Sequence, residues 1–282
     1  EDLGEGLNNG DLDALEAVTL AVEAMENEPL FNAGRGSVLD ENGNVGMDAS
    51  IMRGVDKAAG SVIGLTTTRH PVRAAQHLLL EGWPVMLAGP PGDDFGKRHR
   101  VEQMERSWFE TELRKAQWEK WKAQRLRPGA TDEEDALLDH DGEQDGWGTV
   151  GAVALDVHGQ VAAATSTGGM TGKPVGRVGD TAIIGAGTWA DQTIAVSCTG
   201  VGEAFIRTVA AHSVAVHHRT EGLEKAALKV LEEVEPLGGR GGLIAVNTDG
   251  EVVMPFQTML MYRGVYADGT CQVGIGPDLI HS

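Results

Sequence analysis

The sequence predicts a layered α+β sandwich built on antiparallel strands. Three observations support this fold class: strands that are apolar or small on both faces, short turns of one repeated type, and helices with one apolar face. Short turns join antiparallel strands, which excludes a Rossmann sheet. The chain has 282 residues, of which 41% are hydrophobic, and this is enough for a sizeable core.

The first predicted helix covers residues 11–26, with Asp11 as its N-cap. Its apolar residues recur at helical spacing and are Leu12, Leu15, Val18, Val22 and Met25. One face of this helix is therefore expected to be buried.

A turn pattern recurs three times along the chain, at residues 38–45 (VLDENGNV), 154–161 (ALDVHGQV) and 245–252 (AVNTDGEV). In each copy an apolar strand ends at Asp or Asn, a Gly follows three residues later, and a second strand begins with Val soon after. Each copy predicts a short hairpin turn.

The remaining elements follow from shorter patterns. Strands that are apolar or small on both faces cover 150–155, 161–165 and 242–246, and they predict a covering layer on each side of their sheets. Further strands are predicted at 61–67, 84–88, 181–185 and 193–198, and further helices at 202–218 and 223–234.

The middle of the chain is strongly charged. Residues 97–122 predict one charged helix that carries Trp108, Trp118 and Trp121. A solvated helix with a few packed tryptophans is the favoured interpretation, and a partner-binding helix is the alternative. Eight of the fifteen residues from 131 to 145 are Asp or Glu, so charge repulsion predicts a mobile acidic linker over about 126–148. The alternating D-x-D pattern of a calcium loop is absent from it.

Composition argues against several classes of partner. A net charge of −19 disfavours nucleic acid and anionic membranes, which need clustered Lys and Arg. No run of eighteen apolar residues predicts a membrane span. Cys198 and Cys271 form no disulfide framework and match no zinc spacing, so a reducing, cytoplasmic location is expected. The chain opens without a Met or a strand, as if an N-terminal piece were missing.

The end of the linker, GWGTVGAVALD at 146–156, places Thr149 directly after Gly148 and before a buried strand. Cleavage of the Gly148–Thr149 bond would give Thr149 a free amine with a pKa of about 8, which can take the proton from its own hydroxyl. Glycine tolerates the strained backbone that an internal hydroxyl attack requires. The alternative is that the Gly-Thr pair only begins a strand.

A loop-rich segment at 165–187, TSTGGMTGKPVGRVGDTAIIGAG, carries Arg177 and Asp180. An Arg guanidinium fits a carboxylate and an Asp fits an ammonium group, so the pair predicts a receptor for a free amino-acid head group. A surface ion pair is the alternative. Pro174 stands where a phosphate loop needs Ser or Thr, which excludes that kind of site.

A second glycine-rich turn, SCTGVGEAFIR at 197–207, runs from a strand through Gly200 and Gly202 into a helix. Main-chain N–H groups at such a turn point outward and can stabilise a developing oxyanion. Any tight turn into a helix also uses glycine, so the segment by itself does not decide between these roles.

Four segments together carry a family resemblance. They are FNAGRGSVLDENGNVGMDASIMRG, GTVGAVALDVHGQVAAATSTGGMTGKPVGRVGDTAIIGAGTWAD, SCTGVGEAFIR and GGRGGLIAVN. They closely resemble the plant-type L-asparaginases, also called isoaspartyl peptidases or β-aspartyl-peptidases, of the N-terminal-nucleophile (Ntn) hydrolase superfamily. The resemblance covers residues 11 to 265 apart from the linker. It implies one domain with a four-layer αββα fold, which cleaves itself into an α subunit, 1–148, and a β subunit, 149–282.

The resemblance implies an autoprocessing hydrolase that acts on the side-chain amide of L-asparagine or of β-aspartyl dipeptides. The residues that match its catalytic positions are Thr149, Thr167, Asn32, Thr199 and Gly200. Thr149 is the implied nucleophile, Thr167 positions it and Asn32 supports it, while Thr199 and Gly200 form the implied oxyanion hole.

Other residues match binding positions of the family. Arg177, Asp180 and Gly202 match residues that grip the substrate carboxylate and amino groups. The segment MENEPLFNAGR matches a loop whose main-chain carbonyls hold a structural sodium ion, and the implied ligands are Met25, Glu26, Glu28, Phe31, Ala33 and Arg35. The resemblance further implies a homodimer of cleaved heterodimers and no cofactor for catalysis.

Two segments depart from the family pattern. The usual first core strand and its His-Gly-Gly motif are absent, and FQTMLMYRG at 256–264 has Gln257, Met259 and Leu260 in place of a shorter polar residue, an acidic residue and glycine. Met259 and Leu260 predict a more apolar substrate pocket. Two other functions stay open at this point: a glycosylasparaginase-like hydrolase, and an unprocessed protein that only binds an amino acid.

Overall fold

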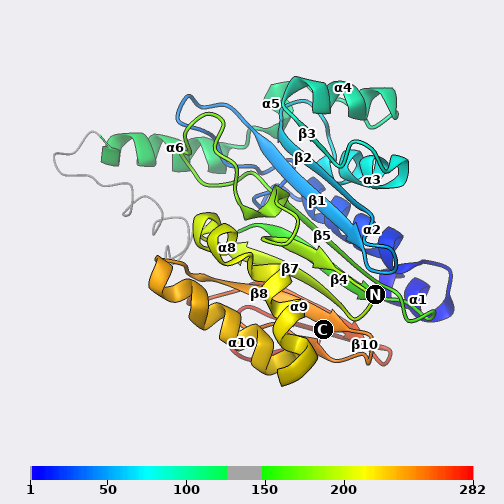
Figure 1. Ribbon diagram of the computed structural model, residues 1–282. Coiled ribbons are helices and arrows are strands. Elements are labelled where there is room, and N and C mark those ends of the chain that lie inside the picture. Colours follow the sequence, from blue (N-terminus) through cyan, green and yellow to red (C-terminus); the bar gives the residue numbers. More distant parts are fainter. Residues whose placement is uncertain (1, 126–147, 282) are drawn as a thin grey trace.

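Two stacked sheets with helices on their outer faces form the body of the molecule (Figure 1). The computed structural model describes residues 2–125 and 148–281. Apart from Gly148, the predicted acidic linker lies outside the described residues, so its mobility stays a prediction.

The first sheet has five strands in the order β3-β2-β1-β5-β4. Their bounds are Met86–Ala88 (β3), Ala59–Leu65 (β2), Met47–Arg53 (β1), Val161–Thr167 (β5) and Val150–Leu155 (β4). All neighbouring strands are antiparallel except β2 and β3. Helices α2 (Ala14–Asn27) and α3 (Pro71–Glu81) pack on this sheet and form one outer layer.

The second sheet has four antiparallel strands in the order β6-β7-β8-β9. Their bounds are Thr188–Ala190 (β6), Ile194–Gly200 (β7), Gly241–Asn247 (β8) and Val252–Val253 (β9). Helices α8 (Gly202–Thr208), α9 (Ala210–Glu221) and α10 (Leu223–Val234) form the other outer layer. A smaller sheet follows, with β10 (Arg263–Ala267), β11 (Thr270–Gly274) and β12 (Ile280–His281).

The two larger sheets stack through β4 and β5 on one side and β7 and β8 on the other. Small residues allow this close approach: all seven residues of β5 are buried, and Gly151 lies so near the Ser197 hydroxyl that a side chain on it would clash. Buried hydroxyl groups between the two sheets form hydrogen bonds with one another. Thr165 Oγ1 lies 2.5 Å from Thr188 Oγ1 and 2.8 Å from Ser197 Oγ. The predicted αββα sandwich is therefore confirmed.

The three repeated turns share one hydrogen-bond pattern. Asp40, Asp156 and Asn247 each accept, through Oδ1, the main-chain N–H groups two and four residues later. The glycine three residues later has a positive φ in every copy, between 73° and 84°. This side-chain hydrogen bonding explains why each turn needs Asp or Asn at its first position, and it confirms the predicted turns.

The first helical region differs from its prediction at the N-terminus. Helix α1 (Asp2–Asn9) precedes α2, and the N–H of Asp11 donates to the Gly6 carbonyl to close its end. The N-cap of α2 is Asp13, whose Oδ1 accepts the Glu16 N–H at 2.7 Å. The predicted N-cap, Asp11, is therefore wrong, while the predicted buried face of α2 is confirmed.

The charged middle region is three helices instead of one. They are α4 (Pro90–Arg98), α5 (Arg106–Phe109) and α6 (Glu112–Arg125). Arg100 adopts a positive φ of 63°, and the chain turns back there because the Val101 N–H bonds to the Gly96 carbonyl. Helix α6 extends from one edge of the sandwich in Figure 1, yet Trp118 donates to the Asp40 carbonyl at 2.8 Å. The predicted single helix is therefore wrong, while the expected packing of its tryptophans is confirmed at Trp118.

Two other element predictions need correction. The helix predicted at 202–218 is divided at Val209, where φ is 50°, into α8 and α9. The strand predicted at 181–185 is a 3-10 turn, Asp180–Ala182, because the N–H groups of Ile183 and Gly187 both bond to the Asp180 carbonyl. No helix within the described residues is both long and apolar enough to cross a bilayer.

Candidate active site

Thr149 and Thr167 face each other at the open end of the β4–β5 hairpin. The antiparallel register pairs Val150 with Ser166, and the next pair outward is Thr149 with Thr167. Their Oγ1 atoms are hydrogen-bonded at 3.0 Å, with Thr167 buried and Thr149 half-buried. The turn that begins at Asp156 closes the other end of this hairpin, so a local sequence motif determines the pairing of the two hydroxyls.

A loop that follows β5 supports Thr167. The Gly169 N–H donates to Thr167 Oγ1 at 3.0 Å, and the Asn32 side-chain amide donates to the Gly169 carbonyl at 2.7 Å. Asn32 also accepts the Gly168 N–H through its main-chain carbonyl at 2.9 Å. A side chain on Gly168 would come within 2.5 Å of Asn32 Oδ1, so only glycine allows this contact. The structure thus brings the predicted Asn32 beside the two threonines.

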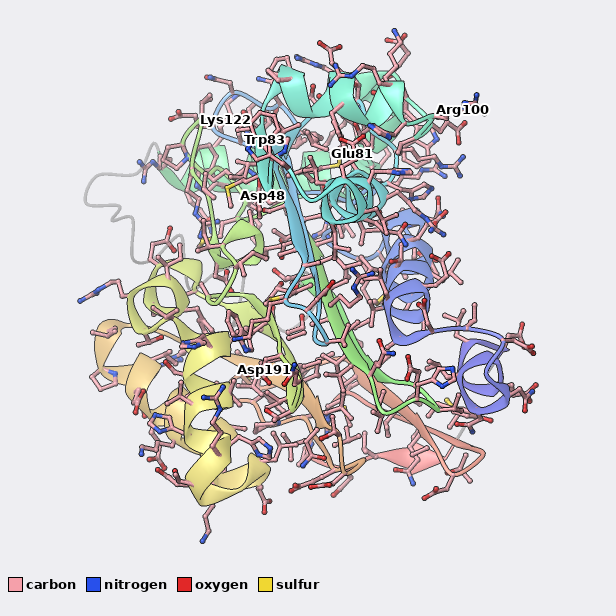
Figure 2. The ribbon with its side chains drawn as sticks, turned by 45° about the vertical axis from the view of Figure 1, so that its right-hand side comes forward. Asp48, Glu81, Trp83, Arg100, Lys122 and Asp191 are labelled. Carbon is pink, nitrogen blue, oxygen red and sulfur yellow. The ribbon has the colours of Figure 1, made fainter. Side chains whose placement is uncertain are left out.

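Lys173 is a buried cation that the sequence reasoning did not select. Its ammonium group donates to the carbonyls of Gly168 at 2.8 Å and Gly46 at 2.6 Å. Asp48, which is labelled on β1 in Figure 2, is the principal opposite charge. Burial lowers the pKa of Lys173 and raises the pKa of Asp48, in each case against the attraction of the other. Lys173 lies in the segment GGMTGKP, which the sequence reasoning compared only with a phosphate loop. When that kind of site was excluded, the lysine was not considered further.

Thr199 and Gly200 end β7 close to the Gly148–Thr149 bond. Thr199 Oγ1 lies 3.3 Å from the position that a Cβ on Gly148 would occupy, and Gly148 is exposed. Gly200 packs so closely on Gly241 and Phe205 that a side chain there would clash with both. The predicted oxyanion residues therefore lie at the same bond as the predicted nucleophile.

Asp180 is a buried acid of the site whose pKa is raised. It is 4% exposed, its Oδ2 has no hydrogen-bond partner within the described structure, and burial raises the pKa of Asp180 to about 7. Gly202 makes room for it, because a Cβ there would lie 2.8 Å from Asp180 Oδ1 and 3.1 Å from Arg177 Nη2. A buried carboxyl with one unpartnered oxygen is suited to an ammonium group that arrives with a ligand.

Arg177 is held by a residue that the sequence reasoning did not select. Its Nε and Nη2 both donate to the carboxylate of Glu203, each at 2.9 Å. The Arg177 side chain is 13% exposed and that of Glu203 is 55% exposed. The alternative of a surface ion pair between Arg177 and Asp180 is wrong, because Asp180 is buried and Arg177 pairs with Glu203. Glu203 lies in the first turn of α8, where acidic residues are common without any role in binding. Only its contact with Arg177 in the folded protein indicates a role at the site.

Two pockets meet at Thr149. The head-group pocket, of about 30 Å³, is lined by Asn32, Thr167, Arg177 and Asp180. The apolar pocket, of about 130 Å³, is lined by Met25, Phe31, Leu243, Leu260, Met261 and Tyr262. Gly148, Thr149 and Gly200 border both pockets. A molecule that reaches Thr149 can therefore extend to either side of it.

The segment 25–35 covers the last residues of α2 and the compact loop that follows it. The Glu26 carbonyl accepts the Arg35 N–H at 2.8 Å, and the Glu28 carbonyl accepts the Phe31 N–H at 3.1 Å. A carbonyl oxygen has two lone pairs, so these oxygens retain capacity for a hard cation. Main-chain oxygens are the donor type that the implied sodium ion would use, and the ion itself stays a prediction.

The Glu26 side chain connects this loop with β5, the strand that ends at Thr167. Its Oε1 accepts the Ser166 hydroxyl at 2.6 Å and the Val72 N–H at 3.1 Å. Burial raises the pKa of Glu26, which has no exposed surface. Ser166 directly precedes Thr167, so the Glu26 side chain supports the strand end that carries Thr167. The sequence analysis assigned a role only to the main-chain carbonyl of Glu26.

Comparison with known proteins gives consistent matches over most of the chain. A family model described as asparaginase matches residues 4–275. The isoaspartyl peptidase of Escherichia coli is 44% identical over 93% of this chain and 82% of its own length. A putative isoaspartyl peptidase/L-asparaginase of Dictyostelium discoideum is 41% identical over 92% and 82%, and the human isoaspartyl peptidase/L-asparaginase is 38% identical over 98% and 87%.

Proposed function

The chain belongs to the asparaginase family, and we propose that it is an N-terminal threonine hydrolase of L-asparagine and β-aspartyl dipeptides that releases L-aspartate. One observation carries this proposal: the Thr149 hydroxyl lies 3.0 Å from that of Thr167, at the border of a pocket that contains Arg177 and Asp180. This arrangement combines a nucleophile with groups complementary to an amino-acid head group.

Activation requires cleavage of the bond before Thr149. The Thr149 hydroxyl attacks the Gly148 carbonyl, the C–N bond breaks, and the acyl group passes from nitrogen to oxygen. Water then hydrolyses this ester and leaves Thr149 with a free amine. Gly148 supports the step because it is exposed and has no side chain to obstruct the attack, and the Thr199 hydroxyl lies beside it.

Substrate binding uses the two charges of the head-group pocket. The substrate ammonium group pairs with the buried Asp180 carboxylate, and the substrate carboxylate binds the Arg177 guanidinium. Glu203 holds Arg177 through Nε and Nη2, which leaves Nη1 beside Gly169 and Gly179 at the pocket wall. Binding at both ends orients the side-chain amide toward Thr149.

Hydrolysis then follows the chemistry of a threonine that is its own base. The Thr149 amine takes the hydroxyl proton as Oγ1 attacks the side-chain amide carbon, and donors at Thr199 and Gly200 stabilise the oxyanion. Removal of one such donor costs about 3 kcal/mol in the barrier. The amine returns the proton to the leaving nitrogen, ammonia or an amino acid departs, and water cleaves the β-aspartyl ester.

Two further features belong to the proposal. The loop 25–35 binds sodium through its main-chain carbonyls, which stabilises the fold without taking part in the reaction. Melting in sodium chloride against choline chloride at equal ionic strength tests this, with a higher melting temperature expected in sodium. The cleaved protein forms a homodimer of heterodimers, which analytical ultracentrifugation measures directly.

The decisive experiment combines mass and activity. Purified protein should convert into two fragments, the second beginning at Thr149, and should then hydrolyse asparagine and β-aspartyl-leucine. The variant Thr149→Ala should stay intact and inactive, whereas Thr149→Ser should retain partial cleavage. A single unbroken active chain would overturn the mechanism. Faster hydrolysis of glycosylated asparagine than of β-aspartyl-leucine would identify a glycosylasparaginase, and binding without turnover would identify an amino-acid-binding protein.

A further inference from the structure

The apolar pocket differs in character from the rest of this acidic chain. None of the residues that line it within the described structure is Asp, Glu, Lys, Arg or His. Its walls include Met25, Phe31, Leu260, Met261 and Tyr262, in a protein whose net charge is −19. The head-group pocket, which also borders Thr149, by contrast contains Arg177 and Asp180. The two pockets therefore suit groups of opposite polarity.

The geometry of an amide relates these two pockets to the two halves of a substrate. An amide carbonyl carbon is planar, so its carbon substituent and its nitrogen substituent point away from each other. When Thr149 attacks this carbon, the aspartyl head group extends toward Arg177 and Asp180. The leaving nitrogen and whatever it carries then point away from the head-group pocket, and the apolar pocket also borders Thr149 and can receive them.

We propose that the apolar pocket receives the side chain of the leaving residue of β-aspartyl dipeptides, and that Leu260 gives the enzyme a preference for apolar leaving residues over charged ones. This inference rests on the function proposed above and specifies its substrate. Asparagine releases only ammonia, which leaves the pocket unused.

The size of the pocket agrees with this assignment. Its volume is about 130 Å³, and an apolar cavity of roughly 150 Å³ accommodates a molecule the size of benzene. A leucine, methionine or phenylalanine side chain is of this order. Burial of such a side chain favours it about 10-fold or more over glycine at the same position. A lysine or aspartate side chain would lose hydration there without gaining a partner.

Leu260 is held in place by its neighbours. Thr258 Oγ1 donates to the Leu260 carbonyl at 2.9 Å, and the Met261 N–H donates to the Ile275 carbonyl at 2.8 Å. Leu260 is 49% exposed, so one side of it faces the pocket while the rest faces solvent. Met259 precedes it, is 62% exposed and is not among the lining residues. Of the two apolar residues that the sequence marked in this segment, only Leu260 borders the pocket.

The neighbouring pair provides a variant and its matched control. We would measure kcat/KM of the cleaved enzyme for asparagine and for the β-aspartyl dipeptides of leucine, glycine and lysine. The wild type should prefer β-aspartyl-leucine to β-aspartyl-lysine about 10-fold or more. Leu260→Glu should lower the leucine-to-lysine ratio about 10-fold, since it adds a carboxylate to the pocket. Met259→Glu makes the same charge change outside the pocket and should leave the ratio within twofold. Leu260→Met should preserve the preference.

The outcomes separate this inference from the proposed function. If the wild type hydrolyses asparagine and all three dipeptides but shows no leucine preference, the inference is wrong and the function stands. An equal change of the ratio in Met259→Glu and Leu260→Glu would also overturn it, because a general charge effect would then explain both. If the cleaved protein hydrolyses none of the four compounds, the proposed function fails and the inference fails with it.

Discussion

Thr149 and Thr167 occupy paired positions at one end of the β4–β5 hairpin, and their hydroxyl oxygens lie 3.0 Å apart. The pairing depends on the register of the hairpin, which the Asp156 turn at the other end determines. A shift of one residue would turn Thr167 to the opposite face of the sheet and separate the two hydroxyls. The candidate nucleophile is therefore positioned by a turn at the far end of the same hairpin.

Removal of the Thr167 hydroxyl should impair catalysis while leaving substrate binding intact. Thr167→Val keeps the shape of the buried side chain but leaves the Gly169 N–H without its acceptor and Thr149 without its neighbour. We expect kcat to fall about 100-fold with a small change in KM, measured on the cleaved enzyme. Thr167→Ser restores the hydroxyl and should retain most of the activity. Full activity in Thr167→Val would contradict a positioning role.

The raised pKa of Asp180 predicts the pH dependence of substrate binding. Asp180 must be ionised to pair with the substrate ammonium group, and burial raises its pKa to about 7. We expect kcat/KM of the wild type to rise as the pH increases through about 7. The residual kcat/KM of Asp180→Asn should not show this rise. A flat profile between pH 5 and 8 in the wild type would exclude this assignment.

The same pKa shift predicts how stability depends on pH. The folded-state pKa of Asp180 lies above its ordinary value of 3.8, so the folded protein binds the extra proton between these two values. The stabilisation that this proton gives the folded state is complete below pH 4 and is lost as the pH rises through 7. Asp180→Asn should therefore be more stable than the wild type at pH 8, by up to roughly 4 kcal/mol, and about equal to it at pH 4. Denaturant unfolding of both proteins at the two pH values measures this.

A methyl group at position 202 should weaken substrate binding. In Gly202→Ala the new Cβ would lie 2.8 Å from Asp180 Oδ1 and 3.1 Å from Arg177 Nη2, so both groups must move. We expect KM for asparagine to rise about 10-fold or more, because the pocket loses the separation of its two charges. Gly276→Ala is the control, since a Cβ there meets nothing within 4 Å. Equal KM values in the two variants would refute the steric role of Gly202.

Lys173 and Asp48 should behave as a coupled pair. Lys173→Met removes the donor to the Gly168 and Gly46 carbonyls and leaves Asp48 without its principal opposite charge. The free energy of unfolding should fall by about 3 kcal/mol. Asp48→Asn in the same chain should recover part of this loss, which a double-mutant cycle in urea measures. Strict additivity of the two substitutions would show that the charges do not interact.

Local chemistry allowed several elements to be predicted. Helix α10 has the predicted bounds, Leu223–Val234, because its apolar spacing and the residues that follow it are unambiguous. The three repeated hairpin turns were predicted for the same reason. The predictions at 97–122 and 202–218 overran helix ends at Arg100 and Val209, where non-glycine residues adopt a positive φ that no sequence pattern marks.

The candidate site was predictable where its residues lie in local motifs. Thr149, Thr167 and Asp180 belong to recognisable segments, and the structure brings them to one pair of adjoining pockets. Three side chains of the site were not predicted, because each contacts a partner that is distant along the chain. Lys173 contacts Gly46, Glu203 contacts Arg177, and Glu26 contacts Ser166. Their catalytic and binding roles stay predictions until the variants are measured.

The sequence by itself determined the alternation of buried strands and turns, the register of the hairpin that pairs Thr149 with Thr167, and the Gly-Thr junction, since all of these depend on neighbours within a few residues. Only the tertiary structure decided that Asp180 is buried with one carboxyl oxygen unpartnered, that Glu203 holds Arg177, and that Leu260 rather than Met259 borders the apolar pocket. The physical reason is that burial and charge pairing depend on distance in space, and stacking of the two sheets brings together residues that the chain keeps far apart.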